Sequence, residues 1–326
     1  MISRRGFLAG SVTLLAAPLV NEAQPLKQVR IGYLSSIPPA DTQDAIDAFR
    51  TKLRALGYIE GQNLLIESRH AEGRFERLPQ LAADLVRLRV DVIFAFSTPG
   101  TVAAKSATST TPIVFAGVSD PLIAGLVATL TRPGGNVTGV TLSNPELSAK
   151  RLSLLKESVP GASPVAILAN PDLRASTSMV AEARRAARAL GVEIQVIEVR
   201  QPEELAKAFQ TMTAANAHAV DVLPDAMFVA QRRRIVELAA SSRIPAMYHL
   251  RQFVEAGGLI SYGADYVEAF QQGAVLVDKI LKGAKPADLP VEQPWRFALA
   301  INLKTAKALG LTIPPSLLLR ADQVIE

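Results

Sequence analysis

The chain of 326 residues contains no cysteine. Disulfide bonds, thiolate nucleophiles and thiolate metal sites are therefore excluded, and so is a lipid anchor on an N-terminal cysteine. Histidine is scarce as well. The three histidines, His70, His218 and His249, are scattered without the spacing of metal ligands. We therefore predict no metal site, and we expect each histidine to be a surface or loop residue.

The signatures of common α/β enzymes are also missing. The turn after the first predicted strand, residues 35–39, reads Ser-Ser-Ile-Pro-Pro, which is not a glycine-rich phosphate loop. No P-loop, Gly-x-Ser-x-Gly turn or Ser-x-x-Lys motif lies between a strand and a helix. The absence of these motifs predicts a protein without a cofactor and without catalytic activity. A doubly wound enzyme is the weaker alternative.

Aromatic residues make up only 5% of the chain, with a single tryptophan. The formal charge is +5, and the one dense basic run is residues 232–234, Arg-Arg-Arg. A nucleic-acid surface would interleave such a run with aromatic side chains, which this one lacks. We interpret it as the solvated face of a helix and expect no nucleic-acid partner.

Beyond the first residues, no apolar run reaches the length of a membrane span. Residues 1–23 combine a basic start, with Arg4 and Arg5 in a twin-arginine-like motif, and an apolar stretch over residues 7–20. This pattern predicts a cleavable export signal; an ordinary amphipathic helix is the alternative. We expect a periplasmic protein that is soluble after cleavage, by either the twin-arginine or the general secretory route.

What the chain does contain is a repeat. An apolar strand at residues 31–34, a helix ending at Gly57 and a strand at residues 64–67 recur as residues 165–168, a helix ending at Gly191 and residues 194–198. Glycine ends the helix both times, as a left-handed C-cap requires. A third strand pair follows, at residues 111–115 and 244–248. Strands alternating with helices predict parallel sheets with helices on both faces.

We therefore predict an α/β protein of two doubly wound parallel-sheet lobes joined by a multi-strand hinge. Lobe one is expected to hold residues 27–141 and about 263–288, and lobe two residues 142–262 and about 289–326. Hinge segments are predicted at residues 141–143, 262–264 and 290–294. Two such lobes set their strand ends opposite one another, which predicts a ligand cleft.

Ligands of open parallel sheets bind outside the carboxyl ends of the strands. Residues that follow the predicted strands are therefore the candidate ligand-binding set: Ser35, Ser36, Ser97, Thr98, Gly117, Ser119, Asp120, Asn170, Asp225, Tyr248 and Tyr262.

Ser97 and Thr98 stand at the head of a helix, where free backbone N–H groups and the positive dipole end favour a carboxylate. A plain N-cap is the equal alternative. Asp120 either receives a ligand ammonium or caps the next helix. Tyr248 and Tyr262 either give the ligand an apolar face with a polar tip or are core aromatics.

Five segments, residues 56–63, 112–121, 132–139, 255–263 and 281–286, give the chain a family resemblance. Over nearly its whole length it resembles the type I periplasmic solute-binding proteins of ABC importers, in the broad bacterial group typified by tryptophan- and tyrosine-binding proteins. The resemblance implies a monomeric receptor that closes two lobes, as a Venus flytrap does, on a small amino-acid-like solute. Its partners would be the permease and ATPase of an inner-membrane importer.

The resemblance further implies that Ser97 and Thr98 hold the solute's carboxylate and that Asp120 or Asp225 holds its ammonium. A periplasmic ligand sensor with a membrane signalling partner is the alternative, because the same fold serves receptors. A repressor would need an N-terminal helix-turn-helix, and this chain has the predicted export signal there.

Overall fold

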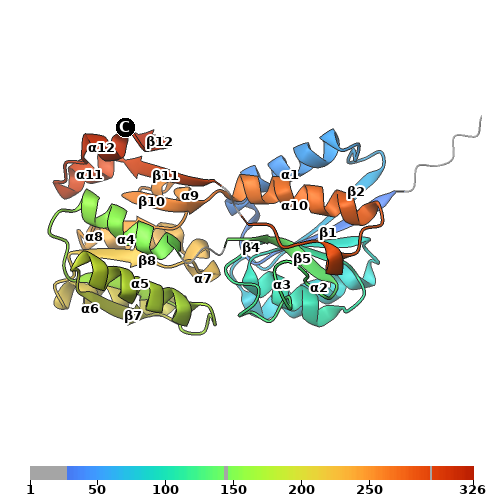
Figure 1. Cartoon of the computed structure of the whole chain (residues 1–326), viewed down its shortest axis with the longest axis horizontal. Coiled ribbons are helices and arrows are strands. Elements are labelled where there is room, and N and C mark those ends of the chain that lie inside the picture. Colours follow the sequence, from blue (N-terminus) through green and yellow to red (C-terminus); the bar gives the residue numbers. More distant parts are fainter. Residues whose placement is uncertain (1–27, 143–145, 294–295) are drawn as a thin grey trace, which may run out of the picture.

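The computed structural model describes residues 28–142, 146–293 and 296–326. Two α/β lobes lie side by side along the longest axis (Figure 1). The predicted export signal, and residues 143 and 294 of the predicted hinge, lie outside the described residues.

Lobe one is built on a five-stranded sheet in the order β2-β1-β3-β4-β5, with every pair parallel. Its strands are β1 (Val29–Ser35), β2 (Leu64–His70), β3 (Val92–Phe96), β4 (Ile113–Val118) and β5 (Val137–Thr141). All five residues of β3 are buried, because helices cover both faces of a parallel sheet.

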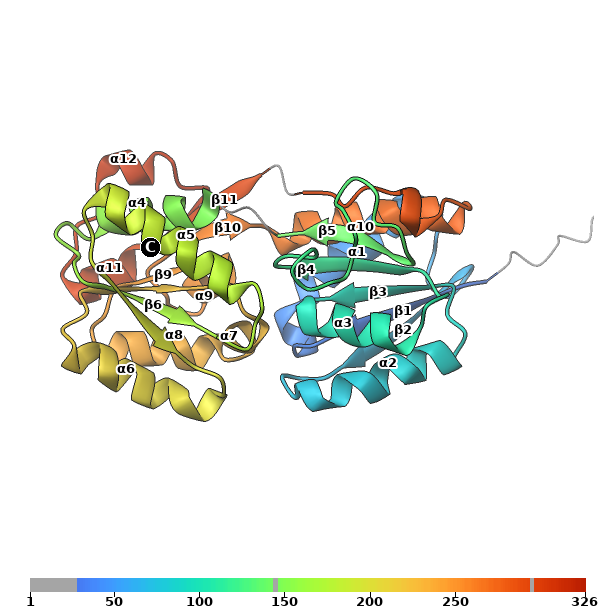
Figure 2. The ribbon, with the colours of Figure 1, turned by 60° about the horizontal axis from the view of Figure 1, so that its bottom comes forward.

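The helices of lobe one pack in two pairs, one on each face of the sheet (Figure 2). On one face lie α1 (Gln43–Ala55) and α10 (Tyr266–Leu281); on the other lie α2 (Leu78–Arg87) and α3 (Thr98–Ala107). Short 3-10 turns η1 (Pro39–Asp41), η2 (Phe75–Arg77) and η4 (Pro286–Asp288) complete the lobe. The ring of Phe270 meets that of Phe94 edge-on at 5.0 Å, so α10 supplies part of this lobe's core.

Lobe two is built on a seven-stranded sheet in the order β12-β11-β10-β9-β8-β6-β7. Its strands are β6 (Val165–Ala169), β7 (Ile194–Glu198), β8 (Ala219–Val222), β9 (Ala246–Tyr248), β10 (Ile260–Ala264), β11 (Phe297–Asn302) and β12 (Gln323–Ile325). The pair β10–β11 is antiparallel, unlike the purely parallel sheet predicted. The chain leaves lobe two after β10 and returns from lobe one into β11, so β11 runs the opposite way.

The helices of lobe two are α4 (Glu146–Ser158), α5 (Ser176–Leu190), α6 (Leu205–Ala214), α7 (Ala226–Ala230), α8 (Arg232–Ser241), α9 (Arg251–Glu255), α11 (Leu303–Leu309) and α12 (Pro315–Leu318), with the 3-10 turn η3 (Pro202–Glu204). Helices α4 and α5 pack against each other, and so do α6 and α8. The two-lobe α/β fold class is confirmed.

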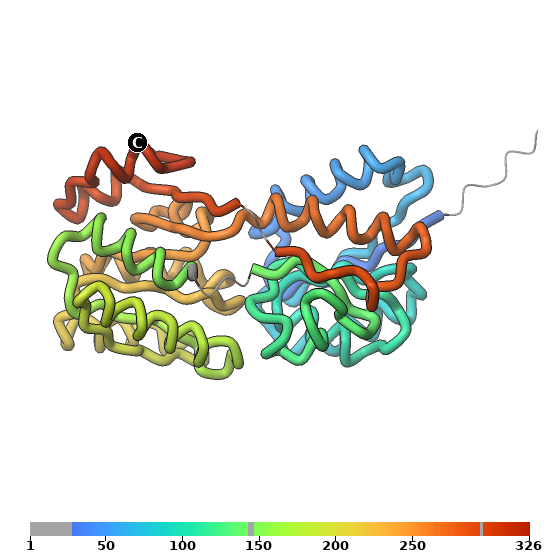
Figure 3. The backbone as a smooth tube through the Cα atoms, in the orientation of Figure 1, coloured from blue at the N-terminus to red at the C-terminus, as the bar shows by residue number. Residues whose placement is uncertain are grey.

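The chain passes between the lobes three times: between β5 and α4, between β10 and α10, and between η4 and β11 (Figure 3). The returning segment runs beside β5, where the Glu292 N–H donates to the Gly139 carbonyl at 2.9 Å and the Thr141 N–H donates to the Glu292 carbonyl at 3.0 Å. The residue at which each lobe ends stays a prediction.

Candidate functional site

Two adjoining cavities, of about 150 and 40 Å³, lie between the lobes. Ser119, Leu142, Pro224 and His249 line both of them. These four residues follow β4 and β5 of lobe one and β8 and β9 of lobe two. Both sheets therefore point the carboxyl ends of their strands into one cleft, where ligands of such sheets bind.

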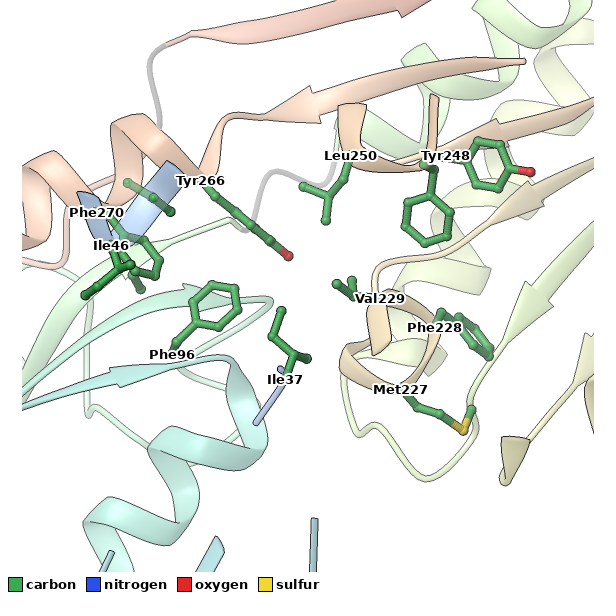
Figure 4. Close-up of a cluster of buried hydrophobic side chains, with 14 of the residues drawn as sticks. Ile37, Ile46, Phe96, Met227, Phe228, Val229, Tyr248, Leu250, Tyr266 and Phe270 are labelled. Atoms are coloured by element: carbon green, nitrogen blue, oxygen red, sulfur yellow. The ribbon is translucent and has the colours of Figure 1, made fainter. Parts of the chain in front are cut away.

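Apolar side chains from both lobes meet around the smaller cavity (Figure 4). Ile37 and Phe96 come from lobe one and Val229 comes from lobe two. Tyr266, at the start of α10, also lines this cavity, and its hydroxyl is directed toward lobe two. Burial raises the pKa of Tyr266, so the phenol stays neutral and brings an apolar face with a polar tip.

Ser97 and Thr98 lie at the start of α3 and line the smaller cavity, but their hydroxyls already have partners within the protein. Ser97 has a φ of +76°, and its Oγ accepts the Gly100 N–H at 3.4 Å. The Ser36 and Ser97 hydroxyls are 2.6 Å apart. Thr98 Oγ1 accepts the Ser119 N–H at 3.3 Å. The N-cap alternative for Ser97 is thus present, and its contact with a ligand stays a prediction.

Gly117 and Asp120 shape the loop after β4. Gly117 has a φ of +74°, and a Cβ there would lie 2.5 Å from a ring carbon of Phe96. Only glycine fits this position without strain. Oδ1 of Asp120 accepts the N–H groups of Leu122 and Ile123, each at 2.9 Å, while the residue lines the larger cavity. Asp120 therefore caps the turn and also faces the cleft.

On lobe two, Asp225 caps α7 and lines the smaller cavity. Its Oδ1 accepts the N–H groups of Met227 at 2.8 Å and Phe228 at 3.1 Å, and its Oδ2 accepts a bond from Nδ2 of Asn170 at 3.0 Å. Burial raises the pKa of Asp225, and these hydrogen bonds oppose that shift. Asn170 lines neither cavity, so in this structure it positions Asp225.

Of the predicted set, Ser35, Ser36, Asn170, Tyr248 and Tyr262 line neither cavity, whereas Ser97, Thr98, Gly117, Ser119, Asp120 and Asp225 do.

The two tyrosines depart most clearly from the predicted ligand-binding set. Tyr248 is buried on β9 and stacks on Phe253 at 4.6 Å, so it is a core aromatic. Tyr262 packs near Phe297 on β11, at 6.1 Å between ring centroids. Side chains along a strand point alternately to opposite faces of the sheet, so a residue inside the strand need not face its end. The hydroxyl of Ser35 is also turned inward, onto the Ile37 carbonyl at 3.0 Å.

Sequence reasoning missed Arg151, which lies on α4 and lines the larger cavity. Its side chain is only 2% exposed, and its Nε lies 3.4 Å from Oδ1 of the fully buried Asp221 on β8. Nη2 of Arg151 donates to Oγ of Ser148 at 3.3 Å. Burial raises the pKa of Asp221, and the positive charge of Arg151 opposes that shift. A buried charge of this kind is common at functional sites.

His249 lies in the loop between β9 and α9, which fits the expected surface or loop position, but it is buried there, with 4% of the residue exposed, and it lines both cavities. Burial, with the charge of Arg151 adding to it, lowers the pKa of His249 to about 3. The ring is therefore neutral at pH 7. It bonds to the backbone of Val222, and its Nδ1 has no hydrogen-bond partner within the described residues.

Within the described ranges, no group of three or more histidine, aspartate or glutamate side chains is placed to hold a metal ion. Over the same residues, no helix combines the length and apolar character needed to cross a bilayer. The described part of the cleft offers hydrogen-bonding groups, the buried ion pair of Arg151 and Asp221, and apolar side chains.

The family model for ABC transporter substrate binding proteins matches residues 38–325. A curated tyrosine-binding protein of Clostridioides difficile is 28% identical over 289 residues, which cover 87% of this chain and 82% of that protein.

Two solved structures are similar to this one. An ABC domain from Streptococcus pneumoniae in complex with L-Trp is 30% identical, with a TM-score of 0.86, over 92% of this chain and all of that one. A ligand-free, open substrate-binding protein from Clostridium difficile is 26% identical, with a TM-score of 0.69, over 91% of this chain and 99% of that one.

The matched range takes in every strand of the lobe-two sheet, strands β2 to β5 of the lobe-one sheet, and every residue that lines the two cavities except Ile37. The type I periplasmic binding protein fold implied by the resemblance is confirmed. This chain belongs to the family of ABC transporter substrate-binding proteins.

Proposed function

We propose that the protein is an extracytoplasmic receptor that closes its two lobes on a small amino-acid-like solute. It then delivers the solute to the permease and ATPase of an ABC importer in the inner membrane. The observation that carries this proposal is the shared cleft, because Asp120 of lobe one and Arg151 of lobe two line one cavity. A solute in that cavity would touch both lobes at once.

Binding and closure are coupled by this geometry. In an open form each lobe would present half of the site, and neither half would hold the solute as well as the closed cavity does. Contacts to both lobes form only on closure, so the solute shifts the population toward the closed form. The three crossovers between the lobes supply the hinge.

The relatives support an amino-acid-like solute, since one is a tyrosine-binding protein and another was solved with L-Trp. The cavity walls agree with that class in combining charged groups, such as Asp120 and Arg151, with apolar ones, such as Met179. The proposed receptor acts as a monomer in the periplasm, binds the solute unchanged and performs no catalysis.

The test begins with protein exported by a host that expresses the full chain. Mass spectrometry after gentle purification identifies any retained small molecule, and a thermal-shift screen covers the twenty L-amino acids. We expect one or a few amino acids to bind one to one and to reduce the radius of gyration in X-ray scattering. Turnover of the bound molecule, or unchanged scattering across all twenty with no retained solute, would contradict the proposal.

Delivery needs a separate test in the native cell. We expect deletion of the coding sequence to slow uptake of the labelled solute, and the wild-type chain to restore it. Unchanged uptake, together with capture of a membrane signalling protein in a pull-down, would favour the sensor alternative.

A further inference from the structure

One arginine in the larger cavity has hydrogen-bonding capacity left over. A guanidinium carries five N–H donors in a fixed fork. Arg151 donates from Nη2 to Ser148, and its buried Nε has no hydrogen-bond partner within the described residues. The unmet Nε shows that the ion pair with Asp221 is incomplete, and a further acceptor beside the guanidinium would stabilise the buried charge.

Asp221 does not use up that capacity. The distance between Arg151 Nε and Asp221 Oδ1 is 3.4 Å, which is long for a charged hydrogen bond, and neither oxygen of Asp221 accepts one from the described residues. Asp221 provides a counter-charge beneath the arginine and does not line the cavity. A buried ion pair becomes favourable when further hydrogen bonds complete it.

The other residues that line the larger cavity indicate which kind of molecule would complete the ion pair of Arg151 and Asp221. The carboxylate side chains Asp120 and Glu182 line the same cavity as Arg151, and Leu147 and Met179 add apolar surface. One cationic group, two anionic groups and an apolar wall suit a molecule that carries a carboxylate, an ammonium and an apolar body. An α-amino acid has all three.

We propose that Arg151 binds the carboxylate of an α-amino acid in the larger cavity, with the ammonium toward Asp120 and Glu182. The proposal rests on the receptor function proposed above and names the residue that recognises the solute. It departs from the sequence-based assignment of the carboxylate to Ser97 and Thr98. Both hydroxyls already hold neighbouring groups of lobe one, since Ser97 Oγ contacts the Ser36 hydroxyl and accepts the Gly100 N–H, and Thr98 Oγ1 accepts the Ser119 N–H.

The first test leaves the protein unchanged. Calorimetry at pH 6 compares each L-amino acid that binds with its α-amide, which at this pH keeps the ammonium and side chain but loses the carboxylate charge. We expect the amide to bind at least about 30-fold more weakly, as when one partner of a buried charged pair is removed. Equal affinity for the acid and the amide would overturn the proposal.

The second test separates binding from folding. Arg151→Met alone would leave Asp221 charged and buried, so the informative variant is Arg151→Met with Asp221→Asn. Its matched control is Asp221→Asn, which keeps the arginine. With folding checked by circular dichroism, we expect the control to bind the amino acid and the double variant to lose at least about 30-fold in affinity. Equal binding by the two variants would overturn the proposal.

The outcomes also distinguish this inference from the receptor function. If wild-type protein binds only uncharged solutes and still closes in scattering, the role of Arg151 is refuted and the receptor stands. If no amino acid and no retained solute changes the scattering, the receptor function fails first and the role of Arg151 falls with it.

Discussion

Replacing Asp41 with asparagine should weaken solute binding although Asp41 lines neither inter-lobe cavity described above. Asp41 belongs to η1 of lobe one, and its Oδ2 lies 2.7 Å from Nη1 of Arg232, at the start of α8 in lobe two. The two side chains are only 11% and 13% exposed. The ion pair joins the lobes without a peptide link, so a rotation that opens the cleft would break it.

The size of the effect follows from the burial of the pair. A hydrogen bond to a charged group contributes about 1.5–3 kcal/mol when well protected, and an exposed ion pair contributes less than about 1 kcal/mol. For a mostly buried pair we take about 1–2 kcal/mol of the free energy of closure. Since each 1.4 kcal/mol is a factor of ten, Asp41→Asn should lower apparent affinity by about 5- to 30-fold.

That figure holds where the free protein is mostly open, because only then does the whole loss fall on the closed complex. Calorimetry with an amino acid that binds in the thermal-shift screen measures it, at low and at high salt. The matched control is Asp44→Asn. Asp44 lies 3.9 Å from Arg251 and its side chain is 81% exposed, so its loss should change affinity by less than about threefold. Equal affinities for the Asp41 and Asp44 variants would refute the reasoning.

Three further predictions concern the cleft. Ser97→Ala with Thr98→Ala should weaken solute binding, because Thr98 Oγ1 holds the N–H of Ser119, which lines both cavities; by removing the N-cap of α3, the change should also cost about 1 kcal/mol in urea unfolding without loss of the fold, and unchanged affinity in calorimetry would contradict the first part. As the pH is lowered from about 6 to about 4, the free energy of unfolding of the wild type should fall relative to that of His249→Gln by about 1.4 kcal/mol per pH unit. The reason is that the ring takes up a proton near pH 6.5 in the unfolded chain but only near pH 3 in the folded chain. Parallel pH profiles for the two proteins would count against the buried neutral ring. Gly263→Ala should cost about 2 kcal/mol or more, because its Cβ would lie 2.0 Å from the His249 carbonyl oxygen, and a melting temperature equal to that of wild type would contradict this clash.

Local signals in the sequence predicted much of the fold. Gly191 has a φ of +63° and ends α5, as the C-cap pattern indicates. Strands such as β3 were found because an unbroken apolar run is typical of a strand buried on both faces. The strand β11 was predicted but its antiparallel direction was not, since that direction depends on where the chain returns from lobe one. The residues of β11 do not themselves indicate the direction from which the chain returns.

Some of the cleft residues could likewise be predicted from the sequence, and others could not. Ser97, Ser119 and Asp225 were predicted because each follows a strand, and topology alone brings strand ends to one edge. Tyr248 was misplaced because it lies inside β9, where its side chain turns to the core. His249, the next residue, faces the cleft instead. The predicted strand ended at the same residue as β9, so the error lay in assigning its last residue to the cleft, and a difference of one position reverses the face.

Arg151 was missed for a different reason, since no strand-end rule reaches a residue in the middle of a helix. A signal was nevertheless present. Leu147, Arg151 and Leu155 lie four residues apart on α4, so the arginine occupies the stripe that packs inward. An arginine at such a position must be paired or serve a ligand, because burying its charge unpaired is too costly. Asp221 provides the pair, and the place of Arg151 in the wall of the larger cavity argues for the ligand as well.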